Sequence, residues 1–173
     1  MNFKQYLNES IQDDTAFVRE FFNSKLDPTV LLVWADSEEE KGNQLKASML
    51  RNPVVRFDNT TEDVRATLGW PSLKDSRIKT WRFHFGHAMG EPNGILAYEW
   101  VRRKIKSNER TMNVYRQEGF ILNYKTGQWE TMVQSNNLEH NEYTAESISV
   151  DHVPEDILRE VFILLLTHNK IKS

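Results

Sequence analysis

Basic and aromatic residues gather in one segment of the sequence, and together they could bind phosphates. The basic residues are Arg102, Arg103, Lys104, Lys106 and Arg110, with aromatic residues nearby, namely Tyr98, Trp100 and Tyr115. Cationic side chains neutralise phosphate groups, and aromatic rings stack on bases. The formal charge of the whole chain is −3, so nucleic acid would need this local patch and is not the favoured partner. A solvated face beside aromatic core residues explains the same pattern.

Three residues are candidates for catalysis in an enzyme that acts on nucleotides or nucleic acid. Arg82 and His84 would lie near the site, as would Arg102 and Arg103, and Glu130 could serve as acid or base. The sequence contains no G-x-S-x-G elbow, no G-x-x-x-x-G-K phosphate loop and no G-x-G-x-x-G fingerprint. An enzyme is therefore an alternative function, and its catalytic residues stay unidentified.

No pattern in the sequence predicts a metal ion or another cofactor. His84 and His87 could ligate a metal together with His140, but residues three apart on a strand point to opposite faces. The chain has no cysteine, which excludes disulfides and thiolate sites. The adjacent glutamates 38–40 fan around a helix axis, so we expect them to form a solvated helix start.

The first part of the sequence predicts mixed helices and strands. Apolar residues at three- and four-residue steps predict an amphipathic helix over 10–26. The β-branched run over 29–35 predicts a buried strand, and helix-forming residues predict a helix over 37–50. A short strand over 54–58 and a capped helix over 60–69 follow.

The second part of the sequence is rich in strands. Alternation predicts a strand over 78–89, and the glycine and proline residues after it predict a turn. Further strands are expected over 95–105, 111–117 and 147–150, and a hairpin joins 119–124 to 128–133 through Lys125, Thr126 and Gly127. Pro154 opens a final apolar helix that should pack across the sheet.

These elements predict a single α+β domain, with a mostly antiparallel sheet, helices packed on one face and an apolar C-terminal helix. The 173 residues suit one domain of this size. No apolar run reaches the roughly 18 residues that span a bilayer, so we expect no membrane partner. Exposed strand edges or the closing helix could instead supply an assembly interface, which makes a structural subunit another alternative function.

The first nine residues, MNFKQYLNE, form a segment of their own ahead of the domain over 10–173. Phe3, Tyr6 and Leu7 stand at i, i+3 and i+4 and would form one apolar stripe on a helical turn. Isolated helices need about 12 to 15 residues in water, so the segment would order only on binding a partner. The alternative is that the same residues dock on the domain as the first turn of the opening helix.

This segment resembles the capsid-targeting peptides of the internal head proteins of T-even-type tailed phages. Those peptides are short, aromatic and aliphatic, and end in Leu or Ile, any residue, then Glu. The resemblance implies that a prohead protease recognises Leu7 and Glu9 and cuts the bond between Glu9 and Ser10. It also implies the capsid core as a partner, packaging in the virion and injection into the host cytoplasm.

The familiar internal head proteins tend to be basic, whereas this chain is slightly acidic. That difference disfavours a role in DNA packing. We therefore expect a virion protein that is delivered to the host, where it binds or inhibits an unknown host or defence component.

Overall fold

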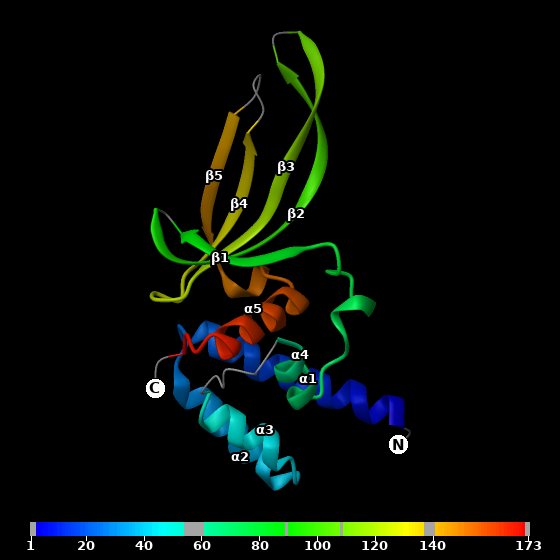
Figure 1. Cartoon of the computed structure of the whole chain (residues 1–173), viewed down its shortest axis with the longest axis vertical. Helices are drawn as coiled ribbons and strands as arrows, with labels where there is room; N and C mark the ends of the chain where they lie inside the picture. Colours follow the sequence, from blue (N-terminus) through cyan, green and yellow to red (C-terminus); the bar gives the residue numbers. More distant parts are fainter. Residues whose placement is uncertain (1–2, 54–60, 89, 108, 137–140, 172–173) are drawn as a thin grey trace. The chain divides into compact units, whose positions relative to one another are not determined.

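The computed structural model describes residues 3–53, 61–88, 90–107, 109–136 and 141–171. It confirms the α+β class, with one antiparallel sheet and separate helices (Figure 1). The chain divides into two compact units, a helical unit of residues 1–79 and 153–173 and a sheet unit of residues 80–152. None of the described helices is both long and apolar enough to cross a membrane.

The helical unit is built from five α-helices and one short 3-10 helix among its described residues. In chain order they are α1 (Phe3–Asn23), α2 (Pro28–Glu40), α3 (Gln44–Arg51), α4 (Thr61–Leu68), the 3-10 helix Leu73–Asp75 and α5 (Glu155–Thr167). α1 packs against α2 and α5, and α5 also packs against α4. The predicted helices over 60–69 and after Pro154 are confirmed. The expected strand over 54–58 lies outside the described residues.

α1 begins well before the predicted start of the opening helix. Its backbone runs without a break from Phe3 through the Glu9–Ser10 bond to Asn23. The segment that resembles a targeting peptide therefore continues directly into the first helix. The side chains at residues 3–12 lie outside the described part of the structure.

The prediction of a strand over 29–35 is wrong, because these residues lie in α2. The carboxylate of Asp27 caps the helix by accepting a hydrogen bond from the backbone N–H of Thr29 at 2.9 Å, and Pro28 occupies the first turn. The buried residues of α2 recur at helical spacing and are Leu31, Trp34, Ala35 and Glu38. A run of seven residues, six of them apolar, does not by itself distinguish a strand from a helix, and the capping residues decide the outcome here.

The glutamates 38–40 end α2 instead of starting a helix, and Glu38 is only 1% exposed. A turn at residues 41–43 separates them from α3 and divides the predicted helix over 37–50. The expectation of a solvated helix start is therefore wrong for Glu38. Its position places it one helical turn after Trp34, on the buried side of α2.

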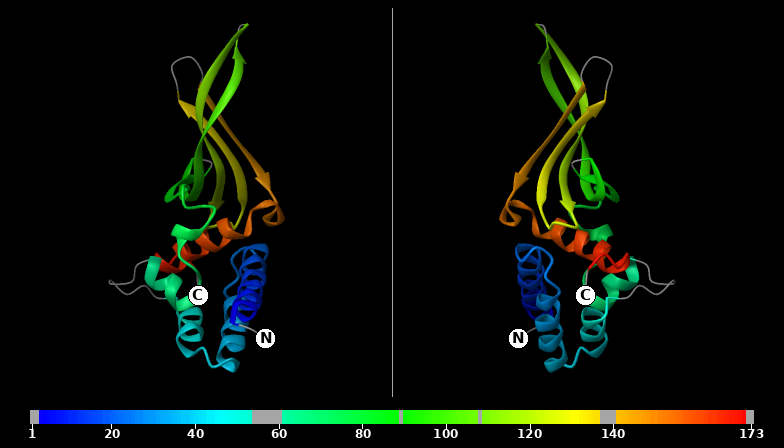
Figure 2. Two further views of the ribbon diagram at one scale, coloured as in Figure 1. Left: turned by 90° about the vertical axis from the view of Figure 1, so that its right-hand side faces the viewer. Right: turned by 90° about the vertical axis from the view of Figure 1, so that its left-hand side faces the viewer.

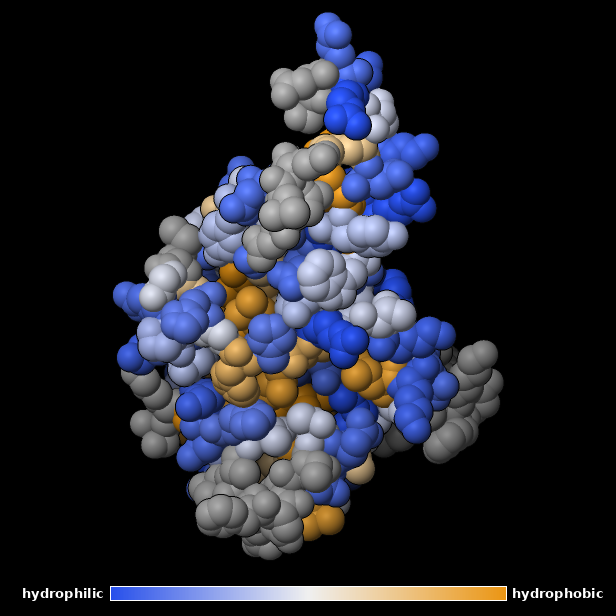
Figure 3. All heavy atoms as spheres, turned by 45° about the horizontal axis from the view of Figure 1, so that its top comes forward, coloured by the Kyte–Doolittle hydropathy of each residue, from blue (hydrophilic) through white to orange (hydrophobic). Residues whose placement is uncertain are grey.

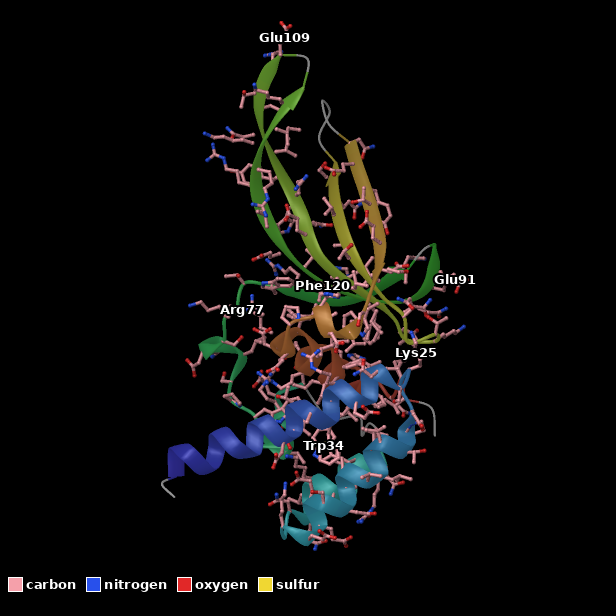
Figure 4. All side chains as sticks on the ribbon, turned by 180° about the vertical axis from the view of Figure 1, so that it is seen from behind. Lys25, Trp34, Arg77, Glu91, Glu109 and Phe120 are labelled. Atoms are coloured by element: carbon pink, nitrogen blue, oxygen red, sulfur yellow. The ribbon has the colours of Figure 1, made fainter. Side chains whose placement is uncertain are left out.

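A buried cluster of charges joins α1, α2 and α3. The ammonium of Lys46 donates a 2.6 Å hydrogen bond to Asp14 Oδ2 and lies 3.4 Å from Glu38 Oε1. The indoles of Trp34 and Trp70 donate to Glu38 and Asp14 respectively, and Figure 4 shows Trp34 between the helices of this unit. All three charged side chains are at most 7% exposed. Their mutual pairing offsets the cost of removing them from water.

The two carboxylates of this cluster differ in pKa. Burial raises the pKa of Asp14, and the nearby charge and hydrogen bond of Lys46 oppose that effect only in part. Burial also acts to raise the pKa of Glu38, but the hydrogen bond from Asn43 and the charges of Lys46 and Lys41 outweigh it and lower the pKa. Lys46 therefore holds two buried carboxylates in place.

The substitution Lys46→Met should destabilise the helical unit by about 3–5 kcal/mol, because it leaves two buried carboxylates without their cation. Urea unfolding followed by circular dichroism measures the change. Arg51→Met is the matched control on the same helix, since Arg51 forms only exposed ion pairs with Asp36 and Glu39. A loss for Lys46→Met no greater than for Arg51→Met would contradict this role.

The sheet unit is a five-stranded antiparallel meander in the order β1-β2-β3-β4-β5 (Figures 1 and 2). The strands are β1 (Arg82–Ala88), β2 (Glu91–Ser107), β3 (Arg110–Asn123), β4 (Trp129–Asn136) and β5 (Asn141–Ile148). The predicted strands over 78–89 and 95–105 are confirmed with shifted ends, as is the hairpin around Gly127, whose φ of 76° suits a turn glycine.

Two boundaries in the sheet differ from the prediction. The expected strands over 111–117 and 119–124 form the single strand β3, because Gly119 lets the chain pass close to β2: a Cβ there would lie 2.0 Å from the carbonyl oxygen of Ala97. The expected strand over 147–150 is instead the end of β5, and Val150 begins a 3-10 turn.

The outer part of β2 and β3 forms a two-stranded ribbon. β4 pairs with β3 only from Gln117 to Leu122, whereas β2 and β3 remain paired as far as Ser107 and Arg110. Figure 4 shows Glu109 at the tip of this hairpin. No third strand therefore pairs with this part of β2 and β3 among the described residues, and only the side chains of the ribbon itself cover its two faces.

Candidate nucleic-acid interface

The strand register assigns the sheet's side chains to two faces, because residues directly opposite each other on neighbouring strands share a face. One face includes three rows that cross the sheet and three pairs on the ribbon. The rows are His84–Leu96–Ile121–Glu130–Ser147, Arg82–Tyr98–Gly119–Met132–Ala145 and Trp100–Gln117–Gln134–Tyr143. The pairs are Arg102–Tyr115, Lys104–Asn113 and Lys106–Thr111. We call this side the aromatic face.

Three aromatic rings are exposed on the aromatic face. Trp100 is 58% exposed, Tyr115 63% and Tyr143 53%. Below them Tyr98 is buried, and its ring meets that of Trp100 edge-on at 6.4 Å between centroids. His84 supports Tyr98 in turn, through a 3.2 Å contact between Nε2 and the phenol oxygen. Large rings normally contribute to cores, so three that lie in water on one face indicate a binding surface.

The aromatic face also carries an excess of cations. Its strand residues include the cations Arg82, Arg102, Lys104 and Lys106, all exposed, against two carboxylates, those of Glu130 and of Glu91, which lies opposite Ala88. None of the four cations forms an ion pair with a described residue. Their charges are consequently available to an external anion.

The opposite face has the reverse balance, with three arginines against four glutamates among its strand residues. Arg103 donates two hydrogen bonds to Glu118, at 2.9 and 2.8 Å, and Arg116 bridges Glu118 and Glu142. The hydrogen bond from Arg103 is the main cause that lowers the pKa of Glu118. The predicted phosphate-binding residues are therefore divided: Arg102, Lys104 and Lys106 share the aromatic face, whereas Arg103 is bound to a glutamate on the other side.

The predicted catalytic residues share the aromatic face but do not meet. His84 on β1 and Glu130 on β4 belong to one row and are separated by three strand spacings, about 14 Å. Arg82 is exposed on β1, and no hydrogen bond joins it to either residue. Oε2 of Glu130 is buried without a hydrogen-bond partner in the described structure. The three side chains do not form a catalytic group by geometry.

The described residues contain no group of three His, Asp or Glu side chains that could hold a metal ion. His84 contacts Tyr98, and His87 lies at an irregularity in β1, between Gly86 and Ala88. His140 lies outside the described residues. The chemistry that the sheet offers is therefore that of rings, amides and cations.

A hollow of about 620 Å³ opens on the aromatic face, where hydrophobic side chains gather between hydrophilic ones in the space-filling view (Figure 3). Five of its lining residues are His87, Leu96, Met132, Gln134 and Tyr143, and Ile121 completes its apolar floor. Each strand contributes at least one of them. The hollow could not be found from the sequence, because it depends on the register of all five strands.

Comparison with known proteins gives no relative from which to assign the site. The chain matches no protein-family model, and searches of curated proteins and of solved structures return no match either. The rings and cations of the aromatic face are therefore the features that indicate a function.

The pairing of Glu118 predicts a pH dependence for the stability of the sheet unit. Because its pKa in the folded state is lowered below the ordinary value of 4.5, its contribution is present above pH 4.5 and is lost as the pH falls through the lowered pKa. Glu118→Gln should therefore reduce stability at pH 7 and have little effect at pH 2, which thermal unfolding at both pH values measures. An equal loss at both values would show that the charge is not responsible.

Proposed function

We propose that the sheet unit binds single-stranded nucleic acid through its aromatic face. The observation that carries this proposal is the division of charge and rings in β2 and β3. Cations without ion pairs and exposed rings share one face. On the other face Arg103 and Arg116 are paired with glutamates, and only Arg110 near the end of the ribbon forms no ion pair with a described residue. Solubility alone does not require the cations without ion pairs to lie on one face.

The cations supply the attraction to phosphates. Arg102, Lys104 and Lys106 follow one another at every second position of β2 and so form a line along the ribbon. Each phosphate they neutralise releases counterions, which favours binding at low salt. The acidic balance of the whole chain does not oppose this, since contacts within a Debye length of about 8–10 Å dominate the local field.

The rings favour a single strand over a duplex. Trp100 and Tyr115 are diagonal neighbours on adjacent strands, about 7–8 Å apart by sheet geometry. Their faces can stack only on bases that are not already stacked in a duplex. The amides of Gln117 and Gln134 lie between Trp100 and Tyr143 in the same row and can hydrogen-bond to base edges.

Binding agrees with the geometry better than catalysis does. An enzyme of nucleotides would bring His84 or Arg82 within hydrogen-bond reach of an acid or base, but Glu130 is several strands away. The proposed role is therefore that of a binding protein, without a chemical step.

The single substitutions Trp100→Ala and Tyr115→Ala should each weaken binding to a fluorescent oligothymidylate by roughly tenfold, since stacking contributes about 1–3 kcal/mol per base. The double substitution Arg102→Ala with Lys104→Ala should reduce the slope of log affinity against log salt by about 1.4, or 0.7 for each phosphate contact. Fluorescence anisotropy titrations at several salt concentrations measure both effects.

Arg103→Ala is the matched control, because it removes a neighbouring cation from the opposite face. It should leave the affinity and the salt dependence unchanged. Equal losses for Arg103→Ala and Arg102→Ala, or tighter binding to duplex than to single strand, would contradict the proposal.

We further propose that the protein is a phage virion protein that residues 1–9 direct to the prohead. The supporting observation is the pattern of the first nine residues, in which an apolar stripe ends at Leu7 and Glu9 follows two positions later. Cleavage after Glu9 would shorten α1 by about two turns and leave the part of the helix that packs with α2 and α5. Binding of single strands would give a delivered protein a target in the host.

Mass spectrometry of purified virions should find the protein with Ser10 as its first residue. Glu9→Gln is expected to leave the N-terminus uncut, because the glutamate is the residue that the protease would recognise. Detection of the intact chain in wild-type virions, or absence of the protein from the particle, would refute the targeting proposal and would leave the binding proposal unaffected.

A further inference from the structure

We infer that the hollow on the aromatic face holds one unstacked base of the bound strand, with a preference for adenine. This inference rests on the proposed binding of single-stranded nucleic acid. It adds a specificity-determining residue, Gln134, to a surface whose phosphate and stacking contacts would otherwise accept any sequence.

The hollow suits a base and not a phosphate. Its floor is apolar, formed by Leu96, Ile121 and Met132, and its polar groups are those of His87, Gln134 and Tyr143. Neither lysine nor arginine lines it. A pocket of a few hundred Å³ with an apolar floor and few polar groups is typical of sites for flat organic ligands.

The hollow is continuous with the proposed path of the strand. Gln134 and Tyr143 belong to the same row as Trp100, so the row that presents rings to the strand also borders the hollow. Tyr143 is 53% exposed at this border. A base that leaves the stack on Trp100 would therefore reach the hollow without leaving the aromatic face.

Gln134 provides the means of discrimination. Its amide has one donor and one acceptor group, and it is half-buried with no hydrogen-bond partner for its side chain among the described residues. A glutamine amide pairs in bidentate fashion with N6 and N7 of adenine, whereas guanine presents two acceptors at the same edge. Leu96, the partly exposed residue of the floor, adds apolar contact area that favours the larger purine ring over a pyrimidine, whereas Ile121 and Met132 are only 1% exposed.

The test compares labelled oligothymidylates that carry one internal adenine, one abasic position or no change. Wild-type protein should bind the adenine-containing strand about tenfold more tightly than plain oligothymidylate, within the range of a good bidentate base contact, and the abasic strand should gain nothing. Gln134→Ala should abolish the preference and leave the salt dependence as it is in wild type. Arg103→Ala, on the opposite face of the sheet, should retain the preference.

The possible failures are distinguishable. Salt-dependent binding without an adenine preference, or a preference that survives Gln134→Ala, overturns this inference and leaves the proposed function standing. Absence of binding to every strand overturns both. An unchanged melting temperature of Gln134→Ala shows that loss of preference does not come from unfolding.

Discussion

The alternation of side chains along β2 and β3 is the constraint on which the functional account depends. Neighbouring residues of a strand point to opposite faces, so Arg102 and Arg103 are adjacent in sequence yet belong to different surfaces. One has no ion pair to a described residue and lies opposite Tyr115, whereas the other is held by Glu118. The period-two pattern thus places cations without ion pairs beside exposed rings on one side of the ribbon, and on the other side it pairs Arg103 and Arg116 with glutamates.

The helical unit uses charge in a different way. Its central cations and carboxylates are buried and bound to one another, as in the cluster of Asp14, Glu38 and Lys46 and in the pair of Arg65 and Glu160. Such groups are costly to bury and are strongly destabilising when one partner is lost. They fix the arrangement of helices, whereas the exposed cations of the sheet unit are available to a ligand.

The sequence predicts an element well where local chemistry decides it. The hairpin turn with Gly127 and the helix after Pro154 follow from turn and capping residues, and both are confirmed. The strand expected over 29–35 is wrong because a run of seven residues, six of them apolar, fits either a strand or a helix. The cap at Asp27 favours the helix. Burial of Glu38 depends on Lys46 from the next helix, which no local pattern reveals.

The candidate site is also only partly predictable from the sequence, because it depends on contacts between residues of different strands. The basic and aromatic residues of β2 are evident in the sequence, but their division into paired and unpaired cations depends on the register with β3. Gln134 and the hollow beside it carry no local signal at all, because Leu96, Ile121 and Met132 meet only when three strands align.

The side-chain indole signals of the five tryptophans in an NMR titration test the central claim most directly. Trp34 and Trp70 are buried in the helical unit, Trp129 is buried in β4, and Trp81 stacks on Phe120, whereas Trp100 is exposed on the aromatic face. Adding a short single-stranded oligonucleotide should shift the Trp100 indole signal most and leave those of Trp34, Trp70 and Trp129 in place. A bound state in which the Trp100 signal does not move would contradict the account.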